Sequence, residues 1–172
     1  MPKQEIYTLI AGVITAIPLV HLWLHALMPF WKKHPLSYYA LVGLLFLASI
    51  GVSFLLLSPA YFLFLPTPFL EIIGWIFMAI GFILVFSAIS TLGWQRFFLL
   101  AIFYPGQIKQ RRIREGIYEK FPHPAYIGWT IVSIGILLAG GLSHLLIPVI
   151  SMIALIPIVI ILEEKELTER TK

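Results

Sequence analysis

The sequence contains no cysteine and no aspartate, and only 12% of its 172 residues carry a formal charge. Without cysteine the chain has no disulfide, no thiolate metal site and no cysteine nucleophile. The 12 basic and 8 acidic side chains are too few to cover the surface of a water-soluble protein of 19.5 kDa. The motifs of P-loops (GxxxxGK), dinucleotide-binding folds (GxGxxG), zinc proteases (HExxH) and serine hydrolases (GxSxG) are also missing. These absences argue against a soluble nucleotide-binding enzyme or hydrolase.

Hydrophobic residues, in contrast, make up 60% of the chain and lie in five long runs. The runs cover residues 6–28, 37–57, 69–90, 124–142 and 145–162. Each can cross a hydrocarbon core of roughly 30 Å as a helix. They predict an all-α integral membrane protein with five transmembrane helices in one domain, residues 1–172. The first run is longer than the hydrophobic part of a secretory signal and lacks a cleavage pattern, so we expect it to be a retained membrane helix.

Lysine and arginine residues indicate the orientation of these helices. With five spans, one side of the membrane holds Lys32, Lys33, Arg96, Lys109, Arg111, Arg112, Arg114, Lys120, Lys165, Arg170 and Lys172. The other side holds only Lys3. Because short basic loops stay in the cytoplasm, we expect the N-terminus outside and the C-terminus inside. The connector 91–123 would then be cytoplasmic in a multi-pass membrane protein, which in a prokaryote would lie in the plasma or inner membrane.

The segment EGIYEKFPHPAYIGW, residues 115–129, joins this connector to the fourth hydrophobic run. Proline suits the first turn of a helix and disfavours helix at the preceding residue, so we expect a helix to begin near Pro124. The free N–H groups and the positive dipole end of that helix would lie beside Tyr118, His123 and Tyr126, where a carboxylate could bind. The alternative is an aromatic belt at the membrane boundary that binds no ligand.

A second polar cluster, Glu163 and Glu164, follows the fifth hydrophobic run. Carboxylates are unfavourable at a helix C-terminus, but residues 163–170 are mostly good helix formers. We therefore predict that the last helix continues past the membrane with both glutamates inside it. Taken alone, this cluster could equally be a solvated helix extension.

The turn at Gly140 and Gly141 predicts that the last two hydrophobic helices form an antiparallel hairpin. Both helices rise by similar lengths, so His123 and Tyr126 would end at the same depth as Glu163. Small residues are expected to pack the two helices of the hairpin closely together: Gly128, Ser133, Gly135 and Ala139. This hairpin would carry the candidate site.

His21 and His25 are four residues apart within the first hydrophobic run. Ionisable residues inside a span are candidates for function, and this spacing can hold a metal or a haem. A third ligand is not evident, so we predict no metal site and keep the metal or haem protein as an alternative.

Together, the two polar clusters resemble the motifs of an integral-membrane methyltransferase family. This family includes isoprenylcysteine carboxyl methyltransferase and relatives that act on phospholipid amines. It carries Gly-x-Tyr, then His-Pro-x-Tyr-x-Gly at the start of a helix, and a Glu-Glu pair at the end of the final helix. The matching residues here are Gly116, Tyr118, His123, Pro124, Ala125, Tyr126, Gly128, Glu163 and Glu164. The resemblance covers residues 92–170.

The resemblance implies S-adenosylmethionine as cofactor and methyl transfer to a lipophilic acceptor at the cytoplasmic membrane interface. The expected partners are a lipophilic small-molecule or lipid-anchored substrate, with a carboxylate as one candidate acceptor group, and membrane lipid. Nucleic acid is not an expected partner. The implied cofactor-binding residues are Tyr118, His123, Pro124, Ala125, Tyr126, Glu163 and Glu164, with Gln110, Arg111, Arg112 and Ile113 as further contacts. No single catalytic residue is implied.

Two positions depart from the family pattern. Pro122 stands where an arginine usually precedes His-Pro, and Val159 stands where some members have an arginine that is proposed to hold the acceptor carboxylate. The second departure argues against a prenylcysteine carboxylate as acceptor. Together they leave one alternative open, a non-catalytic membrane protein that keeps the fold for binding or assembly.

Overall fold

The structure, a computed structural model, describes residues 3–57, 62–104 and 112–170. Most of these residues are helical and none forms a strand, although Phe62 and Leu142 make one isolated bridge. The elements are α1 (Lys3–Ala26), α2 (Met28–Trp31), α3 (Pro35–Leu57), α4 (Pro68–Leu92), α5 (Trp94–Phe97), α6 (Leu100–Phe103), α7 (Ile117–Lys120), α8 (Pro124–Gly140), the 3₁₀ helix η1 (Ser143–Leu145) and α9 (Leu146–Arg170). The all-helical prediction is confirmed for the described residues.

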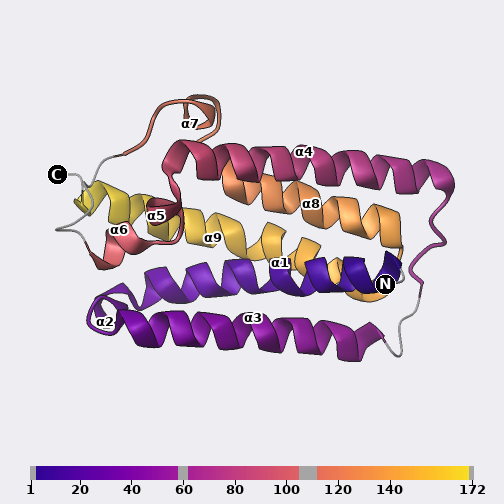
Figure 1. The fold of residues 1–172 in the computed structure, drawn as a ribbon, viewed down its shortest axis with the longest axis horizontal. Helices are drawn as coiled ribbons and strands as arrows, with labels where there is room; N and C mark the ends of the chain where they lie inside the picture. Colours follow the sequence, from indigo (N-terminus) through magenta and orange to yellow (C-terminus); the bar gives the residue numbers. More distant parts are fainter. Residues whose placement is uncertain (1–2, 58–61, 105–111, 171–172) are drawn as a thin grey trace.

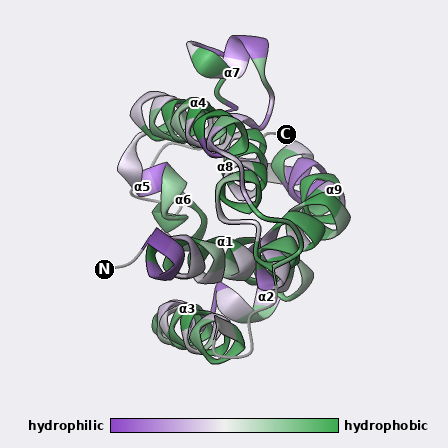
Figure 2. Cartoon of the chain, turned by 90° about the vertical axis from the view of Figure 1, so that its right-hand side faces the viewer, coloured by the Kyte–Doolittle hydropathy of each residue, from purple (hydrophilic) through white to green (hydrophobic). Residues whose placement is uncertain are grey.

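The five predicted hydrophobic runs coincide with the five longest helices. Within the described ranges, four helical segments are long and apolar enough to cross a membrane: α1, α3, α4 and the continuous η1–α9 segment. The fifth, α8, has 17 residues, at the lower end of the range of about 17–25 that a span needs. Hydrophobic residues cover most of the long helices on their outer sides as well as between them, whereas α7 is largely hydrophilic (Figure 2).

The long helices run side by side, and the short helices α2, α5, α6 and α7 gather at one end of the bundle (Figure 1). An ion pair between Lys3 and Glu71 joins the start of α1 to the start of α4 at the opposite end. The C-terminal ends of α1, α4 and α9 and the N-terminal end of α8 therefore lie together. We call this end the connector end.

Glycines allow α4 and α8 to pack unusually closely. A Cβ atom built on Gly81 would lie 2.6 Å from the carbonyl oxygen of Gly128, and one on Gly74 would lie 2.6 Å from that of Gly135. Gly128, Gly135 and Ala139 of α8 thus face α4, and the prediction that these three residues pack the α8–α9 hairpin is wrong. A small residue permits close approach by any neighbouring helix, so its position alone does not identify the partner.

The hairpin itself and the long final helix are confirmed. Gly141 follows α8 in the left-handed conformation (φ 64°), and its N–H donates to the carbonyl of Leu137 at 2.8 Å. α9 then continues for 25 residues, with Pro157 inside it. Glu163 and Glu164 lie within this helix, as predicted from the helix formers that follow them.

α1 lies between α3 and the helices that carry the candidate site. On one side, the Ser49 hydroxyl of α3 donates to the carbonyl of Gly12 at 2.8 Å. On the other, Tyr7, Ala11 and Ile14 belong to the same buried cluster as residues of α8 and α9. This central position brings the last turns of α1 to the connector end.

Candidate functional site

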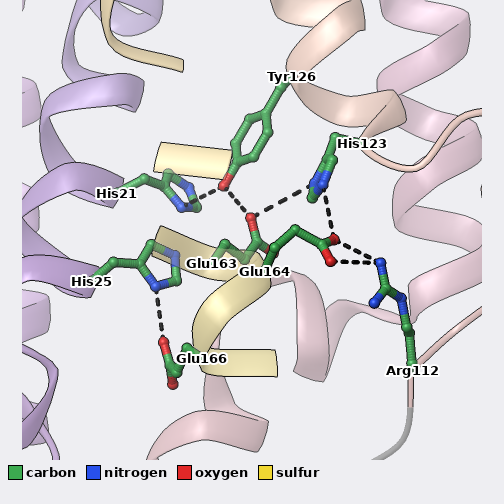
Figure 3. A network of polar contacts seen from close by, with 8 residues as sticks. All are labelled: His21, His25, Arg112, His123, Tyr126, Glu163, Glu164 and Glu166. Carbon is green, nitrogen blue, oxygen red and sulfur yellow. Dashed lines mark hydrogen bonds and ion pairs between the residues drawn. The ribbon is translucent and has the colours of Figure 1, made fainter. Parts of the chain in front are cut away.

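The first turn of α8 places two rings at the connector end. Pro124 is the first helical residue and His123 is its N-cap, as the sequence predicts. The rings of His123 and Tyr126 are nearly parallel, at 17°, with centroids 5.8 Å apart. Both side chains point toward the last part of α9 (Figure 3).

The glutamates of α9 meet these rings directly. The Tyr126 hydroxyl donates to Oε2 of Glu163 at 3.0 Å. Nε2 of His123 lies 3.2 Å from Oε1 of Glu164, and Nδ1 lies 3.8 Å from Oε2 of Glu163 (Figure 3). The convergence of the two polar clusters, which the hairpin predicted, is confirmed.

The connector contributes a cation to the same group of residues. A single terminal nitrogen of Arg112 donates to both carboxylate oxygens of Glu164, at 2.8 and 2.6 Å. The exposed fractions of the two side chains are 39% and 31%, so water screens this ion pair in part. The contact fastens the connector to α9 and leaves Glu164 with two partners, Arg112 and His123.

His21 of α1 is a further member of this network and contacts Tyr126. Its Nδ1 lies 3.0 Å from the Tyr126 hydroxyl, and the two rings meet edge to face with centroids 5.3 Å apart. One turn further along α1, Nδ1 of His25 lies 2.9 Å from Oε2 of Glu166. Both histidines thus connect α1 to the residues of α8 and α9.

The structure bears on the alternative that these two histidines hold a metal. Their partners are a phenol and a carboxylate that already serve as hydrogen-bond partners. In the described part of the chain, no three histidine, aspartate or glutamate side chains are grouped closely enough to hold a metal ion.

A cavity of about 630 Å³ lies at this network. Its wall combines His123, the N-cap of α8, and Ala125 and Tyr126 of α8 with Glu163 and Glu164 of α9. The connector side of the wall adds Arg112, Ile113 and Tyr118, together with Arg96 and Arg114. Residues that are 37 or more positions apart in the sequence therefore line one space.

Tyr118 contributes a phenol to the connector side of the cavity. Burial, and after it the negative charge of Glu163, raises the pKa of Tyr118 to about 12. The phenol therefore stays protonated well above neutral pH and can donate a hydrogen bond to a ligand.

Most residues that the sequence predicted for the cofactor site lie in the cavity wall: Tyr118, His123, Ala125, Tyr126, Glu163, Glu164, Arg112 and Ile113. Pro124 is fully buried and begins the helix that presents its neighbours. Gln110 and Arg111 lie outside the described residues. The role of the set in cofactor binding remains a prediction.

Sequence reasoning missed several lining residues, above all His21. Its position inside a hydrophobic run marked it as unusual, but pattern alone suggested a metal and gave no link to Tyr126. Trp129 also lines the cavity and was not singled out, although it lies three residues after Tyr126, on the same helical face. Arg96 and Arg114 were used only as indicators of topology.

The described residues form a bundle of apolar helices with a charged cavity at one end, which is the architecture of an integral membrane protein with a candidate site for a polar small molecule. The family model described as phospholipid methyltransferase matches residues 69–171, well over half of the chain. The chain belongs to this family of membrane methyltransferases, which confirms the resemblance seen in the motifs. Searches of curated proteins and of solved structures returned no match. α1 and α3 precede the matched segment.

Proposed function

We propose that this protein transfers a methyl group from S-adenosylmethionine to a lipophilic acceptor at the cytoplasmic face of the membrane. One observation carries the proposal: the His-Pro-x-Tyr segment and the Glu-Glu pair line a single cavity. Membership of the family supports methyl transfer in general. The cavity supplies the candidate place for the cofactor.

The size and the charges of the cavity suit this cofactor. Its volume of about 630 Å³ is within the range of roughly 300–1,000 Å³ for small-molecule sites. S-adenosylmethionine carries an ammonium, a carboxylate and a positively charged sulfur. The wall offers carboxylates from Glu119, Glu163 and Glu164. It also offers guanidinium groups from Arg96, Arg112 and Arg114. A wall that carries both signs of charge fits a ligand that does the same.

Within this wall we assign Glu163 to the ammonium of the cofactor, because a carboxylate accepts strong hydrogen bonds from a cation. The N–H groups of the first turn of α8 and the arginines are the candidate partners of the cofactor carboxylate. Tyr126 and Trp129 provide aromatic faces for the adenine or the sulfonium.

The cofactor would supply a methyl group that its positive sulfur has already activated. The protein then has to align the acceptor and exclude water, and it needs no elaborate acid–base apparatus for an acceptor that is already ionised. Ile17, Leu99 and Ile102 give the cavity an apolar wall. We assign this wall to the lipophilic acceptor.

Ligand binding tests the proposal. S-adenosylhomocysteine should raise the melting temperature of the purified protein in nanodiscs, because a ligand that binds only the folded state stabilises it. At 100 times its dissociation constant the gain would be about 2.7 kcal/mol. Adenosine and methionine, each at the same concentration, are the controls and should act more weakly. An unchanged melting temperature at millimolar S-adenosylhomocysteine would refute the proposal.

We further propose that the connector end faces the cytoplasm, because its basic residues outnumber those at the other end. The absence of cysteine permits a clean labelling test in intact cells. Lys33 lies just before α3 at the connector end, Leu65 lies just before α4 at the opposite end, and both residues are exposed. Leu65→Cys should react with a membrane-impermeant maleimide from outside, whereas Lys33→Cys should react only after permeabilisation. The reverse pattern would invert the proposed orientation.

A further inference from the structure

The hydrogen bonds around Tyr126 define the protonation of His21. A phenol has one proton, and Tyr126 is within 3.0 Å of both Oε2 of Glu163 and Nδ1 of His21. An ionised carboxylate can only accept, so the Tyr126 proton is directed at Glu163. The Tyr126 oxygen must then accept its second hydrogen bond from His21. This requires a proton on Nδ1 of His21.

We propose that His21 is a positioning residue of the candidate site: it is held as the Nδ1–H tautomer and directs the Tyr126 proton to Glu163. Glu163 is thereby kept in the cavity wall, oriented for a cationic group of the ligand. His21 belongs to α1, ahead of the segment 69–171 that the family model matches. The site therefore includes a residue from a helix that lies outside the matched segment.

The same arrangement gives His21 a second property. With the proton on Nδ1, a neutral imidazole carries an unprotonated acceptor at Nε2. His21 lines the cavity, and its Nε2 makes no hydrogen bond to the described residues. This nitrogen can accept an N–H or O–H group of the ligand, which restricts the ligand to one that presents such a donor beside Tyr126.

His25 offers a matched control for the contribution of α1 to packing. It lies one turn further along α1 and bonds to Glu166 of α9, and neither residue lines the cavity. Its side chain is 2% exposed, so its contact, like that of His21, lies inside the bundle. A variant at His25 removes a contact of α1 with the other helix of the α8–α9 hairpin and does not touch Tyr126.

Two measurements test the proposal, the second of which rests on the proposed function. First, ¹⁵N NMR of histidine-labelled protein should show His21 as the Nδ1–H tautomer, with its resonances assigned by their loss in His21→Asn. Second, titration with S-adenosylhomocysteine should show at least fivefold weaker binding to His21→Phe. His21→Asn, whose amide can donate from a place near Nδ1 but which lacks Nε2, should recover part of this loss and bind more tightly than His21→Phe. His25→Phe should bind within twofold of wild type.

The possible outcomes separate the two proposals. An Nε2–H tautomer at His21 would overturn the positioning role, whether or not the ligand binds. Wild-type affinity in His21→Phe, or no recovery in His21→Asn, would also overturn it. If the wild type binds no S-adenosylhomocysteine, the proposed function fails and the tautomer alone decides the role of His21. Because the tautomer is measured on the unmodified protein, a variant that fails to fold does not prevent the test.

Discussion

Replacing Glu163 with glutamine is expected to weaken the binding of S-adenosylhomocysteine by roughly 10- to 150-fold. Hydrogen bonds to charged groups contribute about 1.5–3 kcal/mol, and each 1.4 kcal/mol is about a factor of ten in affinity. Glutamine retains an oxygen that can accept from Tyr126, so this variant removes the charge and little of the packing. Isothermal titration on protein in nanodiscs measures the change.

Two other glutamates of α9 make this test specific. Glu164 is bound through both oxygens by Arg112 and is partly exposed, so Glu164→Gln should cost less than tenfold. Glu166 contacts His25 and does not line the cavity, so Glu166→Gln should leave the affinity within twofold. Equal affinities in Glu163→Gln and Glu166→Gln would show that the cofactor does not use this carboxylate.

The ends of the helices were largely predictable because local chemistry determines them. Proline begins α8, where its lack of an N–H group leaves no unpaired donor. Glycine follows the end of α8, where the backbone takes the left-handed conformation. The last helix was correctly extended through Glu163 because good helix formers follow the hydrophobic run. α1 begins at Lys3, ahead of the hydrophobic run, since hydropathy does not register the polar turn that precedes it.

The contacts between helices were less predictable, since they depend on which faces meet in three dimensions. Gly128 and Gly135 correctly indicated a close helix contact, but the partner is α4 and not α9. His21 was marked as unusual by its place in a hydrophobic run, yet its partner Tyr126 is 105 residues away. A spacing pattern identifies a face of one helix and carries no information on the residue that the face will meet.

Introducing valine at Gly81 is expected to lower the free energy of unfolding by about 1–3 kcal/mol, the usual cost of overpacking. Its Cβ would lie 2.6 Å from the carbonyl oxygen of Gly128, and backbone atoms cannot rotate away as a side chain can. The helices would have to separate. Gly43→Val is the matched control, because a Cβ on this exposed glycine of α3 meets nothing within 4 Å.

The same substitution should also alter the geometry of the candidate site. Gly128 lies two residues after Tyr126 on α8, so separation of α4 and α8 would shift Tyr126 relative to Glu163. We therefore expect Gly81→Val to weaken S-adenosylhomocysteine binding as well as to lower the unfolding free energy, whereas Gly43→Val should change neither appreciably. Denaturant titration in mixed micelles and calorimetry measure the two effects. Equal stability of the two variants would contradict the close α4–α8 contact, and lost stability with intact binding would show that α4 supports the fold without positioning Tyr126.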